Sequence, residues 1–352
     1  MNRRRFLLAG LAAPFVLRSA ARAGDDRNRV AIGDMHAHLF FFGPNGAQKR
    51  PLARTMAGGN ATLVAWSLVG DLPWLRRSAR GLRQKGAPEP GEALAWFKDE
   101  VGRIKRHIAE QGLKIVLTPE DVDRALAGEP HVVLSVEGAS FLETDTAALS
   151  AAYDLGIRHL QLVHYVGNPL GDFQTAEPQL GGLTPLGKQV VAECNRLGIL
   201  VDLAHASREA VVQALAISKV PMVWSHGSVT RTGHPHWSMP ATKARQLRLE
   251  DAQAVADRGG VVGLWTLRSD VGGTIAAYAD RLAEMADWLG EDHAAFGTDM
   301  NAISNPPIRD YADLQRVVAH WRRTAMPETR IRKLAIENYA RVLKQALAAK
   351  PA

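Results

Sequence analysis

With 352 residues the chain is too long for one small core, and its length fits one large α/β barrel as well as two ordinary domains. The formal net charge of +7 would indicate a nucleic-acid or anionic-surface partner, but five arginines lie in the first 23 residues, which contain no acid. The rest of the chain carries 38 basic and 36 acidic residues, a net charge of +2, so the charge excludes a basic protein that binds nucleic acid.

The first 23 residues have the pattern of an export signal. Residues 3–7 match a twin-arginine motif, residues 7–17 form an apolar core, and residues 21–23 form a small-x-small cleavage site. The apolar core has eleven residues and contains Pro14, whereas a membrane-spanning helix needs about 20 residues. We therefore predict export by the twin-arginine route, which places the mature protein in the periplasm or outside the cell.

The mature chain, residues 24–352, is expected to have no membrane anchor. No cysteine follows the signal to carry a lipid, and residues 344–352 lack the apolar tail of a lipid-anchor signal. The one cysteine, Cys194, has no partner for an internal disulfide and is interpreted as a small buried apolar residue.

From residue 30 onwards the chain repeats one structural unit, an apolar run followed by a longer segment with helical spacing. Apolar strands that alternate with helices predict a parallel sheet covered on both faces. Eight such units predict a closed (β/α)8 barrel of the TIM type, formed by residues 24–352 as a single domain. The runs are 30–32, 61–69, 131–136, 157–163, 199–204, 220–224, 260–266 and 294–297.

The connections between the runs carry ordinary helix signals. Thr-Pro pairs at 118–119 and 184–185 predict helix starts, and Gly198 predicts a helix end. Two connections, 40–60 and 71–90, are long for a barrel. Loops of this length are lids or binding loops more often than mere insertions, and the sequence does not decide between these roles.

The residues at the carboxyl ends of the runs are chemically alike. In a barrel these ends meet at one rim, where barrel enzymes build their sites. A single His-x-His pair at a strand end is a weak signal, but seven metal-binding or acid-base residues on one rim together predict a functional site. They are His36, His38, Glu137, His164, His205, His226 and Asp299.

Imidazole and carboxylate ligands without a thiolate favour a divalent ion such as zinc, although manganese or iron would suit much the same set. Four histidines and Glu137 exceed the three protein ligands of a usual catalytic zinc ion, which predicts two ions that share Glu137. Water between two cations would lose a proton near neutral pH and attack a carbonyl carbon. Asp299 is expected to receive that proton, and His164 to stabilise the oxyanion.

From about residue 30 to residue 343 the chain resembles the membrane (renal) dipeptidases, metal-dependent barrel hydrolases related to the amidohydrolases. The resemblance implies a metallo-dipeptidase with two zinc ions bound by His36, His38, Glu137, His205 and His226. It also implies that His164 contacts the substrate, that Asp299 is the partner of the bridging water, and that a homodimer is to be expected. The stretches that carry it are 135–138, 160–164, 181–187, 200–207, 224–226, 258–263, 297–299 and 337–339.

Two positions depart from the family pattern. The first strand usually has His-x-Asp, and His38 replaces the aspartate, so the site loses a negative charge and should hold its second ion more weakly. The family arginine that grips the substrate carboxylate is replaced by Trp237. Arg231 could take over that contact or could be an ordinary exposed loop residue, and both readings remain open.

Three functions are consistent with these residues. The first is an exported binuclear zinc dipeptidase that hydrolyses an amide bond in a small-molecule substrate. The second is a related hydrolase of another amide or of a lactone, and the third is a binding protein that has kept its metal. Asp299 argues against the third, because a structural metal site does not need a proton-transfer carboxylate on the rim.

Overall fold

The computed structural model describes residues 29–38, 52–78 and 81–349. The predicted export signal and residues 40–51 of the first long connection lie outside these residues, as do residues 79–80. Among the described helices, none combines the length and apolar character needed to span a membrane.

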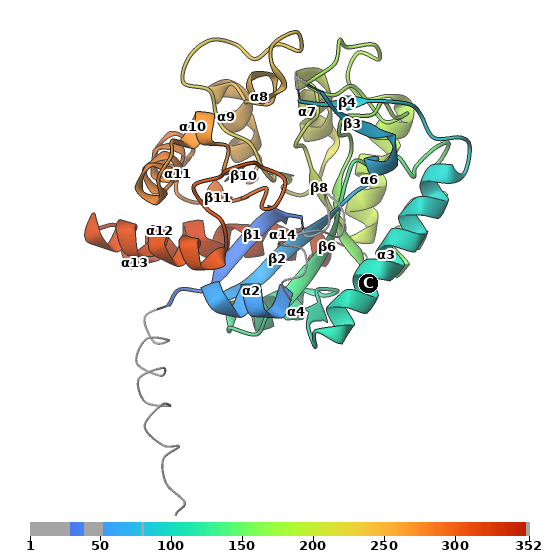
Figure 1. Ribbon diagram of the computed structural model, residues 1–352. Helices are drawn as coiled ribbons and strands as arrows, with labels where there is room; N and C mark the ends of the chain where they lie inside the picture. Colours follow the sequence, from blue (N-terminus) through green and yellow to red (C-terminus); the bar gives the residue numbers. More distant parts are fainter. Residues whose placement is uncertain (1–28, 39–51, 79–80, 350–352) are drawn as a thin grey trace, which may run out of the picture.

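Eight parallel strands form the barrel around which the helices are arranged (Figure 1). All eight predicted apolar runs contribute a strand, so the predicted (β/α)8 barrel is confirmed. A ninth strand, β5 (Lys114–Ile115), is an additional short strand beside β6. In sheet order the barrel strands are β1 (Ile32–Ala37), β2 (Ala61–Val69), β6 (His131–Glu137), β7 (Ile157–Gln161), β8 (Leu200–Asp202), β9 (Val223–Trp224), β10 (Val261–Leu264) and β11 (Ala294–Phe296).

The first and last strands close the barrel through contacts at their carboxyl ends. The buried carboxylate of Asp34 accepts hydrogen bonds from the Thr298 backbone N (2.9 Å) and from Thr298 Oγ1 (2.6 Å). Beyond β11, the backbone N of Asp299 donates to His36 O (3.0 Å) and the N of His38 donates to Met300 O (2.9 Å). These bonds join the two chain segments that carry His36, His38 and Asp299.

Much of the inner wall of the barrel below the strand ends is apolar, with the buried pair of His159 and Asp202 among the apolar side chains. On β2, Leu63 and Ala65 belong to the inner cluster, whereas Val64 and Trp66 pack on the outside, as the alternation of side chains along a strand requires. Helix α14 (Asn338–Ala348) closes the opposite end of the barrel, since its apolar side chains belong to the inner cluster. In the described part of the chain, these apolar side chains fill the barrel below the carboxyl-end rim.

The outer helices follow the strands in the expected alternation. The Thr-Pro signals are confirmed, because α4 begins at Pro119 and α6 at Pro185, and Gly198 ends α6 with a φ of 79°. The helices are α2 (Leu52–Gly59), α3 (Glu92–Glu110), α4 (Pro119–Leu126), α5 (Ala147–Asp154), α6 (Pro185–Leu197), α7 (Arg208–Ile217), α8 (Ala241–Ala244), α9 (Leu249–Asp257), α10 (Arg268–Val271), α11 (Ile275–Leu289), α12 (Tyr311–Arg323), α13 (Glu328–Arg332), the π-helical turn η3 (Lys333–Glu337) and α14. Cys194 is fully buried on α6, as predicted.

The second long connection forms a small ordered unit at the rim. It contains the short helix η2 (Leu72–Trp74) and a hairpin of β3 (Leu75–Ser78) and β4 (Gly81–Gln84). The hairpin lies against α8, because a Cβ added to Gly81 would lie 3.3 Å from the Cβ of Ala241. Figure 1 shows the hairpin and α8 on the same side of the barrel.

The closeness of β10 to the segment after β9 gives a stability prediction. A Cβ at Gly263 would lie 1.9 Å from the carbonyl O of Ser225, so Gly263→Ala should lower the free energy of unfolding by about 1–3 kcal/mol. The control is Gly58→Ala on α2, where a Cβ meets nothing within 4 Å and the helix gains about 1 kcal/mol in propensity. Urea unfolding of both variants measures the difference, and equal stabilities would contradict the described packing.

Candidate metal centre

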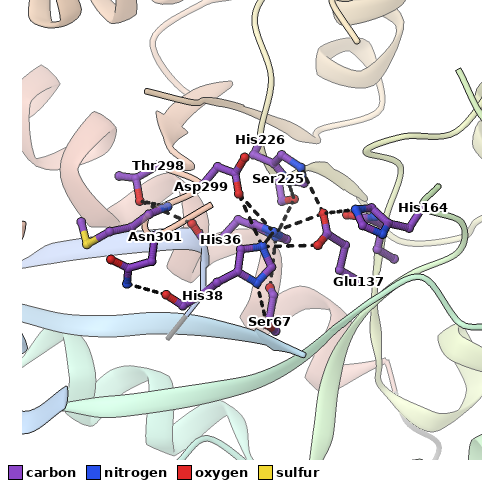
Figure 2. A network of polar contacts seen from close by, with 12 residues as sticks. His36, His38, Ser67, Glu137, His164, Ser225, His226, Thr298, Asp299 and Asn301 are labelled. Carbon is purple, nitrogen blue, oxygen red and sulfur yellow. Dashed lines mark hydrogen bonds and ion pairs between the residues drawn. The ribbon is translucent and has the colours of Figure 1, made fainter. Parts of the chain in front are cut away.

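The structure brings together all seven residues predicted from the strand ends, because five imidazoles lie close to Glu137 and Asp299 lies close to His38. Figure 2 labels six of the seven, all except His205. Glu137 is the last residue of β6 and His36 is the last but one of β1, and the others follow their strands by one to three residues. Six of the seven side chains are almost completely buried, and Asp299 is 9% exposed. Burial of so many ionisable groups is costly unless they are paired or bind a cation.

Two pairs of imidazoles contact one carboxylate. Nε2 of His36 lies 3.0 Å from Nε2 of His38, and Nε2 of His205 lies 3.2 Å from Nε2 of His226. The Oε1 atom of Glu137 is 3.5 Å from the first pair at His36 and 3.2 Å from the second at His205. Its Oε2 atom lies 3.3 Å from His38 Nε2. Glu137 therefore contacts both pairs.

The outer nitrogens of these imidazoles fix their orientation. His38 Nδ1 lies 2.9 Å from the carbonyl O of Ser67, which can only accept, so this nitrogen carries a proton and Nε2 is the nitrogen left to bind a cation. His36 Nδ1 lies 3.0 Å from Ser67 Oγ, and His226 Nδ1 lies 2.9 Å from Ser225 Oγ. Metal-binding histidines are oriented by such contacts.

The donor set fits divalent cations. Within the described part of the chain Glu137 Oε2 is buried without a hydrogen bond, although His38 Nε2 lies nearby. A lone pair on a carboxylate oxygen and a lone pair on an imidazole nitrogen repel each other at about 3 Å unless a proton or a cation lies between the two atoms. The ligand atoms of His36, His38 and Asp299, and those of Glu137, His164 and His205, each lie within 4.8 Å of one another.

The protonation state of the histidines favours metal binding at His205 and His226 and competes with it at His38. Burial and the nearby Arg245 hold the pKa of His205 well below its usual value, and burial, His36 and Arg245 do the same for His226. Burial also lowers the pKa of His38, but Glu137 and Asp299 outweigh it and raise that pKa to about 10. A cation at the His38 side must therefore displace a proton.

His164 is held by a residue that the sequence analysis missed. Its Nε2 lies 3.4 Å from Glu137 Oε1, and its Nδ1 lies 2.7 Å from Oδ1 of the fully buried Asp71. The other oxygen of Asp71 accepts hydrogen bonds from the backbone N of Tyr165 (3.1 Å) and of Val166 (2.9 Å). Asp71 follows the second apolar run, so the rule applied to the other strand ends could have found it.

A pocket of about 350 Å³ opens beside the metal centre. Six of the seven residues line it, and the hairpin of the second long connection also contributes to its wall. That connection therefore has the position of a binding loop rather than of a remote insertion. The other lining residues include Arg77, Leu82, Tyr165, Arg245, Trp265, Leu267 and Ile303.

The two predicted substrate contacts, Arg231 and Trp237, do not line this pocket. The exposed Arg231 side chain pairs with Glu284 on α11, with 3.1 Å between Nε and Oε1. Trp237 lines a second cavity of about 300 Å³, beside His236. The structure thus gives no support to either contact, and it places a different arginine, Arg245, in the pocket wall.

Comparison with known proteins agrees with this arrangement. The family model described as membrane dipeptidase (peptidase family M19) matches residues 54–352. The dipeptidase tcpJ of Claviceps purpurea is 27% identical over 83% of this chain and 68% of its own length. A dipeptidase of Schizosaccharomyces pombe is 30% identical over 57% of this chain and 50% of its own length.

A solved metallopeptidase of Rhodobacter sphaeroides, bound to a phosphinate mimic of the dipeptide L-Ala-D-Ala, has a TM-score of 0.74 with 21% identity, covering 91% of this chain and all of that one. At this identity the likeness concerns the fold alone. The family model, in contrast, matches most of the chain. The chain therefore belongs to the membrane dipeptidase family of metal-dependent peptidases.

Proposed function

We propose that the protein hydrolyses the amide bond of a dipeptide or a dipeptide-like small molecule with the help of two zinc ions. One ion would be held by His36, His38 and Glu137, and the other by Glu137, His205 and His226. The observation that carries the proposal is the position of Glu137 between the two imidazole pairs. When bound, such ions lower the pKa of water and polarise the carbonyl oxygen of an amide.

Two side chains are placed to move protons around the reacting amide. Asp299 is the least buried of the seven residues and lines the pocket, with Oδ1 3.4 Å from His38 Nε2, so its carboxylate can accept a proton there. Burial lowers the pKa of His164, but Asp71 and Glu137 outweigh it and raise that pKa. A protonated His164 can donate a hydrogen bond to the developing oxyanion.

A non-dipeptide amide or a lactone is the second candidate substrate. It is favoured because neither of the two predicted carboxylate contacts, Arg231 and Trp237, lines the pocket beside the metal centre. A binding protein without catalysis is disfavoured, because Asp299 and His164 face the pocket in addition to the proposed ligands.

We also propose that residues 1–23 direct export by the twin-arginine route to the periplasm or the medium. The proposal is supported by the arginines at 3–5, the short apolar core and the small residues at 21 and 23.

A substrate panel with and without a chelator tests the proposed reaction. Zinc-loaded protein should hydrolyse at least one of a set of dipeptides that includes L-Ala-D-Ala, and the activity should disappear on chelation and return with zinc. A matched set of simple lactones and acylated amines separates the second candidate. Undiminished activity in the chelator would contradict metal dependence, and a fully loaded but inert protein would contradict hydrolysis.

The exchange of the usual aspartate for His38 gives a prediction about metal content. Protein purified without added zinc should retain between one and two zinc ions per chain, because the first pair has lost a negative charge and a proton competes at His38. His38→Asp should bring the content closer to two. Elemental analysis measures both, and a firm value of two in the unaltered protein would contradict the prediction.

Asp71→Asn tests the role given to His164. The change removes a charge-assisted contact worth about 1.5–3 kcal/mol, so kcat should fall by about 10- to 100-fold while the metal content stays the same. Asp172→Asn is the matched control, since Asp172 is a buried aspartate that also accepts from backbone amides but lines no part of this pocket. If both variants lose kcat equally, the proposed role of Asp71 is wrong.

A further inference from the structure

Tyr165 is an aromatic residue of the pocket wall to which the proposed reaction gives no role. It follows His164 in the segment after β7, and it lines the pocket of about 350 Å³ beside the metal centre. Its ring meets the imidazoles of His164 and His205 edge-on, with 4.6 Å and 4.9 Å between the ring centres. Tyr165 therefore lies next to both the expected oxyanion donor and one of the expected metal ligands.

One buried carboxylate, that of Asp71, holds His164 and Tyr165 in place together. Its Oδ1 atom contacts His164 Nδ1 at 2.7 Å, and its Oδ2 atom accepts hydrogen bonds from the backbone N of Tyr165 (3.1 Å) and of Val166 (2.9 Å). With Nδ1 bound in this way, His164 directs Nε2 towards the metal centre, 3.4 Å from Glu137 Oε1. The two neighbouring residues thus form one preorganised unit at the rim.

The hydroxyl of Tyr165 is a donor without a protein acceptor. In the described part of the chain only the backbone N of this residue forms a hydrogen bond. Burial raises the pKa of Tyr165 to about 12; the charge of Arg245 opposes this shift, and the charges of Glu137 and Asp299 add to it. The hydroxyl therefore lies within electrostatic reach of the metal centre, and it carries its proton at neutral pH as an ordinary tyrosine does.

Two other tyrosines show what a structural hydroxyl looks like in this protein. The hydroxyl of Tyr278 donates to the carbonyl O of Leu264 at 2.8 Å, and that of Tyr339 lies 3.4 Å from His159 Nδ1. Neither of these tyrosines lines the pocket. A buried tyrosine hydroxyl usually has such a partner. Tyr165 differs from both because it lines a cavity, which indicates that its acceptor is supplied by a molecule bound there.

The hydrolysis proposed above creates an acceptor at this place. When a water oxygen attacks the carbonyl carbon, a C–O bond forms, the electron pair of the C=O π bond moves to the carbonyl oxygen, and the water passes a proton to Asp299. His164 is placed to donate one hydrogen bond to the oxygen that becomes negative. Donors fixed in advance around such an oxygen stabilise the transition state more than the substrate, and a neutral tyrosine hydroxyl is one of the groups that serve in this way.

We propose that Tyr165 is a second oxyanion donor, whose hydroxyl acts beside His164 Nε2 and donates a hydrogen bond to the carbonyl oxygen of the amide as its charge develops. This inference rests on the proposed function and adds a catalytic residue to that site. Tyr165 keeps its proton throughout, so the step needs no acid or base other than those already named. Because the contact strengthens as the charge develops, its loss should lower kcat and leave KM nearly unchanged.

Tyr165→Phe tests this role, because it removes the hydroxyl and keeps the ring that contacts the two imidazoles. On the zinc-loaded full chain, kcat for the dipeptide hydrolysed best should fall about 100-fold with little change in KM. The zinc content and the midpoint of thermal unfolding should stay the same. The proposal is overturned if kcat is unchanged, if only KM changes, or if the loss of kcat is accompanied by an equal loss of zinc.

Tyr153→Phe is the matched control. Tyr153 is a tyrosine of α5 that packs on the guanidinium of Arg158, with 3.7 Å between Cζ and the ring centre, and it lines no part of the pocket. This variant should keep the kcat of the unaltered protein. A loss of kcat as large as that of Tyr165→Phe would overturn the proposal, since any removal of a tyrosine hydroxyl would then have the same effect.

A binding measurement separates this inference from the proposed hydrolysis. The phosphinate mimic of L-Ala-D-Ala carries tetrahedral, negatively charged oxygens in place of the planar amide, whereas D-alanine imitates only a product. Calorimetry on the zinc-loaded chain should show that Tyr165→Phe binds the phosphinate about 10- to 100-fold more weakly and binds D-alanine as the unaltered protein does.

The outcomes of the two measurements distinguish the two proposals. If no amide is hydrolysed but Tyr165→Phe weakens phosphinate binding alone, the proposed function fails and the role of Tyr165 as a donor to a tetrahedral anion stands. If amides are hydrolysed and Tyr165→Phe matches the unaltered protein in kcat and in phosphinate binding, the proposed function stands and the role of Tyr165 is wrong. A zinc-loaded protein that neither hydrolyses an amide nor binds the phosphinate overturns both.

Discussion

The structure depends on one buried carboxylate, Glu137, around which five imidazoles converge. Its oxygens lie between 3.2 and 3.5 Å from an Nε2 atom of each of them. Burial alone would raise the pKa of Glu137, but His164, His36 and His38 hold it well below its usual value. The carboxylate is therefore ionised. Its charge is the reason that so many imidazole nitrogens can lie close together in one buried site. The strands around Glu137 must end at the same level of the barrel to bring these imidazoles together.

Much of this arrangement could be predicted from the sequence. Parallel strands of a barrel end at one rim, so the residues after each apolar run had to meet, whatever their separation along the chain. His36 and His38 could be paired because alternate residues of a strand point the same way. Asp71 was missed because it was interpreted as the start of a long connection, although it follows the second apolar run and the same rule applies to it.

The pocket wall could not be predicted in the same way. Arg245, Arg231 and Trp237 all lie in the irregular connection between β9 and α9, where no periodicity fixes the direction of a side chain. The spacing seen in relatives placed Trp237 at the position of a substrate contact, but in the structure Trp237 lines another cavity. The position of Arg245 depends on α8 and on the hairpin that packs against it, which are contacts between distant parts of the sequence.

The helix α14 at the far end of the barrel has a consequence for how the protein matures. The inner core contains side chains from both β1 and α14. The hydrogen bond between Thr298 and Asp34 must form before the barrel wall is continuous. A chain that is still being synthesised therefore has neither a closed barrel nor all the histidines of the metal centre in their final positions. The complete set of site residues is therefore assembled only after the chain has been synthesised at least as far as Asp299 and the barrel has closed.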